Sequence, residues 1–277
     1  MTSALNAFEA LALVPGWDPA ATEVEELQGG RTNRTFLVVS GGERCVLRLN
    51  ATSTGAFTFD RKCELSILAS AGEAGLAPAT VYSDIENGVL MTEYLPDPVW
   101  TASDLEATEN IEALAELIRR VHALPTSGIK LDLNLSAARY EEYLKRRHGL
   151  HAYALRCREV VASVPQSDHL VCCHNDIVAE NVIASQPLKL IDWEYAGDND
   201  AFFDLASVIR FHNLPQHVSS SLLDAYTGGA DGESQERLAA QERVFDAIQW
   251  LWLASIHLNS PKHDNAVRLE ELQQRIG

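Results

Sequence analysis

The stretch of sequence that decides the fold is HNDIVAEN, residues 174–181, followed shortly by LIDWEY, residues 190–195. Between the two lie short apolar runs that flank a Gln-Pro pair, a pattern that predicts a β-hairpin. Within this stretch Asp176 is followed five positions later by Asn181, and Asp192 ends the second apolar run. We expect the hairpin to fix these three polar side chains relative to one another.

The order of these three side chains is that of a kinase catalytic site. A carboxylate beside an incoming hydroxyl orients it and accepts its proton, so Asp176 is the predicted catalytic base. Mg²⁺ prefers a few oxygen ligands together with phosphate oxygens, and Asn181 and Asp192 supply an amide oxygen and a carboxylate. The same spacing also arises by chance, in a polar turn beside an ordinary hairpin. The combination with His174 favours the catalytic interpretation, in which a phosphoryl group of ATP is transferred to a hydroxyl.

The composition indicates a large core and an acidic surface. The chain has 277 residues, of which 46% are apolar, enough for two lobes or subdomains. No run approaches the roughly 18 apolar residues of a membrane span. Residues 1–14 lack the leader of a signal peptide and resemble a short amphipathic helix. The net charge of -17 disfavours nucleic acid and is compatible with a cationic substrate, although solubility alone also accounts for it.

The cysteines indicate a reducing compartment. There are five of them, an odd number, and none forms a C-x-x-C pair. Cys172 and Cys173 are adjacent, which is a poor geometry for a disulfide, and their apolar surroundings predict core positions. We therefore expect free thiols in a cytoplasmic protein that binds neither nucleic acid nor membrane.

The first third of the chain is predicted to be rich in β-structure. Two β-like runs flank the pair Gly41-Gly42, which is a strong hairpin signal. A helix follows from about Asp60, its predicted cap, with Leu65, Leu68 and Ala69 on its apolar face. The predicted elements are strands at 35–39, 45–49, 80–82 and 89–92 and a helix at 60–73.

The rest of the chain is predicted to be mainly helical. Two prolines within residues 93–98 mark the expected boundary between lobes, which divides the chain into 1–95 and 96–277. Beyond it, apolar residues recur every three or four positions from Thr108, as on a buried helix face. The further predicted helices are 137–147, 152–161, 202–211, 218–226, 235–258 and 266–276. The fold class is therefore α+β, with a small β-rich N-lobe and a larger helical C-lobe, as in protein kinases.

Several motifs together resemble those of choline and ethanolamine kinases within the aminoglycoside phosphotransferase superfamily. Residues 174–181 match the family's His-x-Asp-x4-Asn motif, and LIDWEYAG at 190–197 looks like its metal motif. FDLA at 203–206 resembles the segment that follows, and GGRTNR at 29–34 resembles the family's phosphate loop. The resemblance covers roughly residues 25–210. Bacterial thiamine kinases share the same metal motif, so it does not fix the substrate.

The resemblance assigns further residues to the nucleotide. It places Gly30 and Asn33 in the phosphate loop, and Arg48 at the strand position of the cation that holds the nucleotide phosphates. Glu64 matches the acid that pairs with that cation, the alternative being a solvated helix face. Glu93 and Tyr94 fall at the adenine-contacting hinge. Two supporting residues complete the set: His174, which shapes the catalytic loop without proton chemistry, and Asp204, a buried acid that braces it.

The substrate pocket is less well defined by the motifs. Glu194 and Tyr195, in the metal motif, are predicted to lie at the substrate. Choline kinases are similar to one another in a late Trp-x-x-Trp pair, whose aromatic faces suit a quaternary ammonium group. Here Trp250 and Trp252 are only two positions apart, so we expect one at the pocket and the other in the core. The acid that the family carries after FDL is absent, and Arg210 stands in that stretch. Arg210 would disfavour a cationic substrate if it faced the pocket, but not if it faced solvent or paired with an acid.

Three histidines outside the motifs are predicted to be structural or exposed. His122 lies at a helix end and is expected to be structural. His148 and His151 are expected on the surface without a partner acid.

The leading hypothesis is an ATP- and Mg²⁺-dependent kinase that phosphorylates choline, ethanolamine or a similar small alcohol, which could be cationic. The alternatives are a thiamine kinase, an aminoglycoside-type phosphotransferase and, from another class, a nucleotide-binding pseudokinase. The presence of the full set Asp176, Asn181, Asp192, Arg48 and Glu64 argues against a pseudokinase. The oligomeric state is left open.

Overall fold

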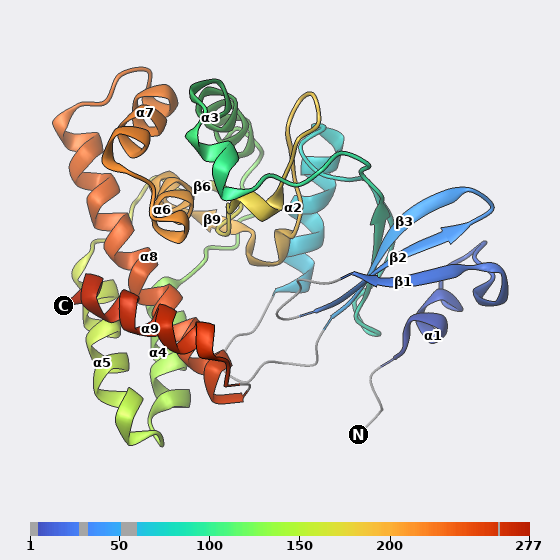
Figure 1. The fold of residues 1–277 in the computed structure, drawn as a ribbon, viewed down its shortest axis with the longest axis horizontal. Coiled ribbons are helices and arrows are strands. Elements are labelled where there is room, and N and C mark those ends of the chain that lie inside the picture. Colours follow the sequence, from blue (N-terminus) through green and yellow to red (C-terminus); the bar gives the residue numbers. More distant parts are fainter. Residues whose placement is uncertain (1–4, 28–32, 51–59, 260) are drawn as a thin grey trace.

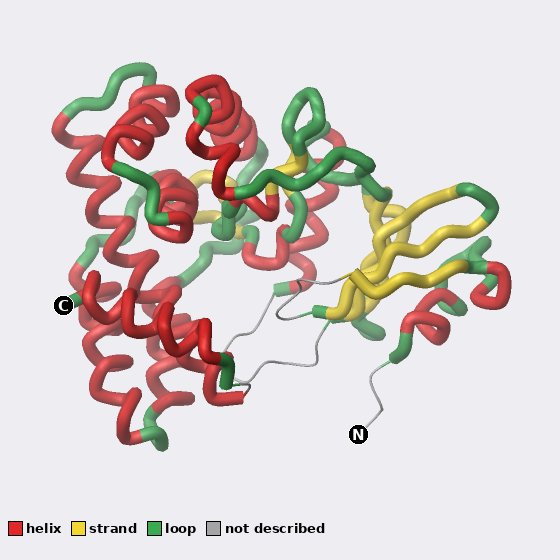
Figure 2. Tube along the Cα trace, viewed as in Figure 1, coloured by secondary structure: helices red, strands yellow, loops and turns green. Residues whose placement is uncertain are grey.

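The computed structural model describes residues 5–27, 33–50, 60–259 and 261–277. An N-terminal antiparallel sheet is followed by a mainly helical region (Figures 1 and 2). In the described part of the chain this sheet has five strands in the order β1-β2-β3-β5-β4. Its strands are β1 (Glu23–Leu27), β2 (Arg34–Ser40), β3 (Glu43–Leu49), β4 (Thr80–Asp84) and β5 (Val89–Glu93). The two-lobed α+β fold predicted from the sequence is confirmed.

The hairpin between β2 and β3 forms where the glycines predicted it. Gly41 and Gly42 have φ angles of 60° and 88°, which residues other than glycine rarely adopt. They join Ser40 to its cross-strand partner Glu43 in a two-residue turn. Strand β1 was not predicted, because it is an edge strand with three acidic residues and lacks the alternation of a buried face.

The buried apolar side chains form two hydrophobic cores, one beside the sheet and one within the helical region. The smaller one joins the sheet to α1 (Ala7–Leu11). The larger one includes α2 (Arg61–Glu73), although this helix lies between strands of the sheet in the sequence. Asp60 caps α2 as predicted, accepting hydrogen bonds from the backbone nitrogens of Lys62 and Cys63 at 3.1 and 3.0 Å. The predicted division of the chain at residue 95 stays a prediction.

The apolar face predicted for α2 was partly wrong. Leu68 is buried, Leu65 is half-buried and Ala69 is exposed. The buried face also contains Ile67 and Ala71, so it is rotated around the helix axis relative to the predicted face. The error arose because α2 packs on the helical region rather than on the sheet alone.

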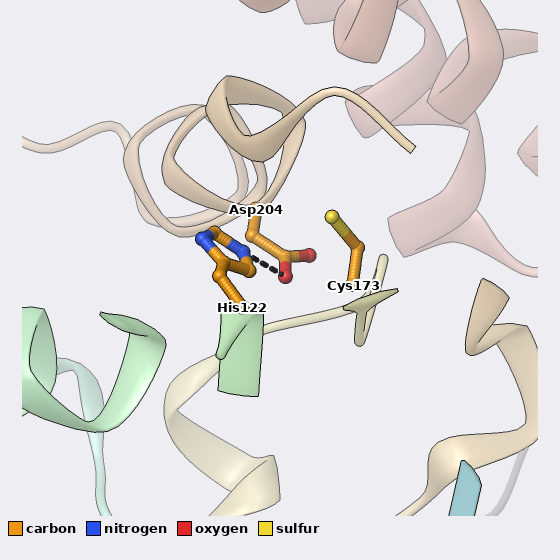
Figure 3. A group of neighbouring side chains, drawn as sticks. All are labelled: His122, Cys173 and Asp204. Atoms are coloured by element: carbon orange, nitrogen blue, oxygen red, sulfur yellow. Dashed lines mark hydrogen bonds and ion pairs between the residues drawn. The ribbon is translucent and has the colours of Figure 1, made fainter. Parts of the chain in front are cut away.

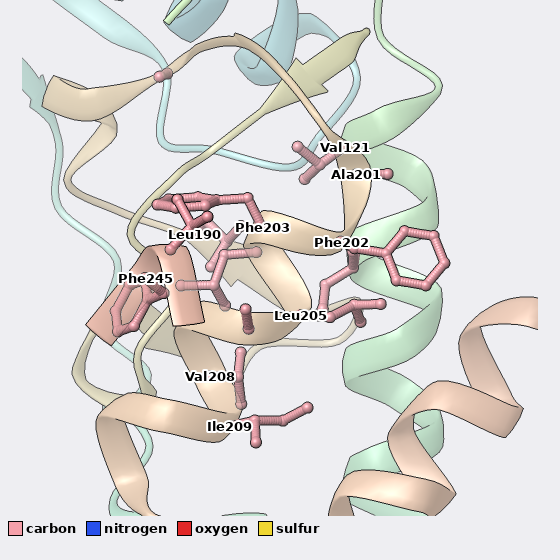
Figure 4. Close-up of a cluster of buried hydrophobic side chains, with 14 of the residues drawn as sticks. Val121, Leu190, Ala201, Phe202, Phe203, Leu205, Val208, Ile209 and Phe245 are labelled. Carbon is pink, nitrogen blue, oxygen red and sulfur yellow. The ribbon is translucent and has the colours of Figure 1, made fainter. Parts of the chain in front are cut away.

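The helical region is arranged around α6, which follows the motif stretch. Helix α6 packs against α8, and α8 also contacts α4, α5 and α9, while α3 packs against α7. Figure 4 shows Phe203 of α6 against Phe245 of α8, with ring centroids 5.6 Å apart. The helices are α3 (Thr108–His122), α4 (Leu133–Leu144), α5 (His148–Ser163), α6 (Ala201–His212), α7 (Gln216–Thr227), α8 (Gly232–Asn259) and α9 (His263–Ile276). Among the described residues, no helix is both long and apolar enough to cross a bilayer.

Two short β-ribbons frame the motif stretch. Strand β6 (Val171–Cys173) pairs with β9 (Gly197–Asn199), and β7 (Val182–Ile183) pairs with β8 (Lys189–Leu190). The second pair is the hairpin predicted from the apolar runs, and it is confirmed. The residues between β6 and β7 form the predicted catalytic loop, 174–181, which therefore leaves one ribbon and enters the other.

Candidate active site

The catalytic loop and the metal motif meet through backbone and side-chain hydrogen bonds. The Asn181 amide nitrogen donates to the Asp176 carbonyl at 2.9 Å and to its carboxylate at 3.3 Å. With the nitrogen engaged, the Asn181 amide oxygen is the atom that could ligate a cation. The backbone nitrogen of Ile191 donates to the Asn181 carbonyl at 2.9 Å. This bond brings Asp192, the next residue, beside the catalytic loop.

Asp192 adopts a conformation that is uncommon for a residue with a side chain. Its φ and ψ angles are 63° and 60°, in the left-handed region. Such backbone strain persists only where the surroundings impose it, and it is concentrated at functional sites. The Asp192 carboxylate is 43% exposed, whereas Asn181 is buried. The exposed carboxylate is thus presented at the open side of the site.

The site carries a surplus of negative charge. Burial, followed by the charges of Asp192 and Glu194, raises the pKa of Asp176 to about 8, and the hydrogen bond from Asn181 only partly opposes this. A divalent cation would offset the repulsion among these acids. The oxygen donors of Asn181 and Asp192 are the hard ligands that Mg²⁺ prefers, so the residues present fit that ion.

The predicted pair between β3 and α2 is formed. The Arg48 guanidinium makes an ion pair with Glu64, and its other terminal nitrogen lies 3.6 Å from the Asp192 carboxylate. Glu64 is 1% exposed, so the alternative of a solvated helix face is wrong. Burial lowers the pKa of Arg48, but the carboxylates of Glu64 and Asp192 outweigh it and the pKa is raised. Arg48 thus stays charged beside the acid predicted to hold the metal.

A second bridge links the sheet to the metal motif. The Asn33 amide nitrogen donates to the Glu194 carboxylate at 2.7 Å. Arg61 lies between the two acids, 2.7 Å from Glu64 and 3.4 Å from Glu194. Sequence reasoning missed Arg61, although its position three residues before Glu64 on one helix face was a usable signal. Glu194 therefore contacts the end of the phosphate loop, in addition to lining a cavity described below.

The other predicted nucleotide residues are placed as follows. Gly30 lies outside the described residues. Glu93 ends β5 and its carboxylate lies 3.5 Å from the Lys189 ammonium. Tyr94 follows it, with the Arg44 guanidinium stacked 3.9 Å from its ring centroid. Their roles at a nucleotide stay predictions.

His174 and Asp204 hold the start of the catalytic loop. Asp204 is fully buried, and its carboxylate accepts hydrogen bonds from the backbone nitrogens of His174 and Asn175 at 3.0 and 2.6 Å. The His174 ring nitrogen Nε2 lies 3.0 Å from the Ile191 carbonyl, which only accepts, so this nitrogen carries the proton. Burial lowers the pKa of His174, which favours the neutral ring. His174 is thus placed to join the loop to the metal motif.

A cluster of His122, Cys173 and Asp204 brings together residue types that bind metals (Figure 3). The His122 ring nitrogen Nε2 lies 3.0 Å from the Asp204 carboxylate, which already accepts two backbone nitrogens. Burial and the Asp204 charge raise the pKa of the Cys173 thiol well above its usual range. A protonated thiol and a carboxylate occupied by donors suit a structural role, as predicted for His122.

The predicted substrate residues do not all converge. Tyr195 is half-buried, and burial, Glu194 and Tyr140 together raise its pKa well above the usual range. Trp250 is fully buried and its ring packs 4.7 Å from that of Tyr153, so it offers no face to a ligand here. Trp252 is half-buried. Trp250 thus takes the predicted core position, whereas the prediction that the other tryptophan lies at the pocket stays a prediction.

A cavity of about 150 Å³ opens beside the metal motif. It is lined by Glu194, Tyr195, the segment 129–132 and residues of α4, among others. Leu135 and Arg139 are the apolar and charged residues that α4 contributes.

Two charged residues have partners that the sequence did not reveal. The Arg210 guanidinium donates to the Asp246 carboxylate at 3.0 Å, so its charge is compensated. His151 lies 2.7 Å from the Glu141 carboxylate, so the prediction that it lacks a partner acid was wrong. The partner is ten residues earlier on a different helix, which sequence spacing does not show.

The sheet, the Arg48–Glu64 pair and the acid-amide-acid set define a protein-kinase-like phosphotransferase. The model of the APH phosphotransferase enzyme family matches residues 23–250, and the chain belongs to that family.

Curated relatives include two forms of protein LicA from Haemophilus influenzae. One is 30% identical over 72% of this chain and 61% of its own length, and the other is 29% identical over 70% and 76%. The chain thus spans less than two thirds of the first of these. Thiamine kinase of Salmonella paratyphi A is 28% identical over 78% of this chain and 74% of its own.

Solved structures give the same fold. A choline/ethanolamine kinase family protein from Mesorhizobium loti has a TM-score of 0.75 at 24% identity, over 98% of this chain and 92% of its own. Choline kinase LicA from Streptococcus pneumoniae has a TM-score of 0.75 at 21% identity, over 92% of both chains. A LicA structure contains AMP, and a spectinomycin phosphotransferase contains ADP.

Proposed function

We propose that this chain is an ATP- and Mg²⁺-dependent kinase that phosphorylates a hydroxyl of choline, ethanolamine or a similar small alcohol. The observation that supports the proposal most is that Asp192 lies 3.6 Å from Arg48 and follows Ile191, which is hydrogen-bonded to Asn181, itself bonded to Asp176. Membership of the APH family and the similarity to LicA support it. The nucleotides in related structures support ATP as the donor.

The chemistry follows from where the charges lie. Asn181 and Asp192 would hold Mg²⁺, which, when bound, supplies positive charge against the phosphate oxygens. Arg48 would grip a phosphate, held in place by Glu64. Asp176 orients the acceptor hydroxyl and takes its proton. As the alcohol oxygen bonds to the γ-phosphorus, the bond from phosphorus to the bridging oxygen breaks and ADP leaves.

A cationic acceptor is compatible with the charges of the described residues. The acids near Tyr195 are Glu194, Asp176 and Asp192, which favour a positive ligand. Arg210, which could have opposed one, is paired with Asp246. The aromatic face of Tyr195 would add cation–π attraction to a quaternary ammonium group.

The test is ADP release from ATP and Mg²⁺ with separate additions of choline, ethanolamine, thiamine and an aminoglycoside. We expect turnover with choline or ethanolamine, and loss of it in the Asp176→Asn variant with the fold retained. Turnover with thiamine alone would support the second candidate, which the 28% identity to thiamine kinase favours. Binding of Mg-ATP without transfer to any alcohol would support a pseudokinase.

A further inference from the structure

One face of α6 accepts hydrogen bonds from the catalytic loop along most of its length. Besides the two bonds to Asp204, the backbone nitrogen of Ile177 lies 3.2 Å from the Ser207 hydroxyl. The backbone nitrogen of Ala179 lies 2.9 Å from the Nε2 atom of His212. We call Asp204, Ser207 and His212 the α6 ladder. Three side chains of one helix therefore accept hydrogen bonds from four backbone N–H groups of the loop, at residues 174, 175, 177 and 179.

The α6 ladder anchors the loop on both sides of the catalytic acid. Asp176 lies between two anchored residues, and Asn181 follows Ala179 by two positions. Ser207 is fully buried and the His212 side chain is 5% exposed. A buried N–H group that loses its acceptor costs free energy, so the loop cannot shift without a penalty. The Ser207 hydroxyl also lies within donating distance of two carbonyl oxygens, that of Asp204 at 2.7 Å and that of Ile177 in the loop at 3.1 Å.

The contact to His212 requires one protonation state. An amide N–H can only donate, so Nε2 must be unprotonated and the neutral ring carries its proton on Nδ1. The Glu180 carboxylate lies 3.7 Å from the same nitrogen and favours the charged ring, while burial and Arg268 on α9 oppose it. Protonation of His212 would therefore replace the bond from Ala179 by an ion pair to Glu180.

We propose that Ser207 and His212 are positioning residues, which hold Asp176 and Asn181 in register for phosphoryl transfer by binding the backbone of the loop. This inference rests on the proposed function for its kinetic readout only. Positioning errors of about 1 Å can reduce turnover about a hundredfold. The role differs from that of Asp204, because His212 anchors the metal-binding end of the loop.

The experiment compares Ser207→Ala, His212→Leu and His212→Gln in the full chain, with Phe245→Leu as the control. Phe245 is buried on α8 against Phe203 and makes none of the ladder contacts. The readouts are kcat and KM for ATP with the alcohol that wild type turns over, thermal unfolding, and hydrogen exchange of the Ala179 amide. We expect His212→Leu and Ser207→Ala to lower kcat by about tenfold to a hundredfold with little change in KM. His212→Leu should also speed exchange at Ala179.

His212→Gln gives the sharper readout, because its side-chain oxygen accepts a hydrogen bond at every pH. We expect it to retain most of kcat. Burial lowers the pKa of His212 below its usual 6.5, so wild type should lose this contact only below that pH. His212→Gln should not show the part of the decrease in kcat at low pH that results from protonation of His212. An acid limb identical to that of wild type would overturn the role of the neutral ring.

The remaining outcomes separate the ladder from the proposed function. Wild-type kcat in His212→Leu, or the same kinetic and exchange changes in Phe245→Leu, would overturn the positioning role. If wild type transfers phosphate to no alcohol, the proposed function fails and amide exchange alone decides. Unchanged exchange at Ala179 in His212→Leu would then overturn the ladder, and faster exchange confined to the loop would support it.

Discussion

The two sides of the candidate site are held by different kinds of interaction. On the side that we propose binds the nucleotide, a chain of ion pairs joins side chains of β3, α2 and the segment 190–195: Arg48, Glu64, Arg61 and Glu194. On the catalytic side, the loop is held by hydrogen bonds from its backbone to side chains of α6. Backbone contacts fix positions along the chain, whereas charged side chains can reorient around a ligand. The two sides therefore differ in what a substitution disturbs, which is charge on one side and the position of the backbone on the other.

The largest expected effect tests the catalytic side. Asp176→Asn keeps the size of the side chain but removes the proton acceptor, so we expect kcat to fall by about 10²- to 10⁴-fold. Circular dichroism and thermal unfolding should stay close to wild type. Turnover within tenfold of wild type would contradict the assignment of Asp176 as the base.

The next effect tests the nucleotide side. Arg48→Met leaves the buried Glu64 with Arg61 as its cation, so we expect a loss of about 2 kcal/mol in the free energy of unfolding by urea. The KM for ATP should also rise. Arg48→Lys should recover part of the stability, because its charge remains while the two-pronged geometry does not. Arg34→Ala, which removes an exposed pair with Glu26, is the control and should leave stability unchanged.

A smaller effect is expected from the bridge between the sheet and the metal motif. Asn33→Ala and Glu194→Gln each weaken the 2.7 Å hydrogen bond between these residues. In a double-mutant cycle on kcat/KM for ATP we expect a coupling of about 1.5 kcal/mol, or roughly tenfold. Fully additive effects would show that the two residues act independently.

The smallest expected effect needs no substitution, because it compares how often the regions around Cys45 and Cys173 open. Burial raises the pKa of Cys45 to about 11 and that of Cys173 well above its usual range, so neither thiol reacts unless the structure opens. Cys45 belongs to the small sheet core, whereas Cys173 lies in β6, fully buried beside His122 and Asp204. We expect pulsed alkylation followed by mass spectrometry to label Cys45 first. Equal labelling rates would indicate that both regions open together.

Much of the fold was predictable because local signals agreed with the final structure. The glycines at 41 and 42, the cap at Asp60 and the periodicity of α3 each act within a few residues. Strand β1 was not predicted, because an acidic edge strand lacks the buried face that gives an alternating pattern. The face of α2 was misplaced because its packing partner is distant in the sequence.

The sequence by itself determined which chemical groups are present and their order, and the roles of Asp176, Asn181 and Asp192 were predicted from spacing and motif. The pairing of Arg48 with Glu64 was also predicted, from family resemblance. Only the tertiary structure decided how these groups are held, because the α6 ladder and the contact of Arg61 with Glu194 join residues 29 to 133 positions apart. Hydrogen bonds over such separations leave no periodic trace in the sequence. They appear only once the chain has folded.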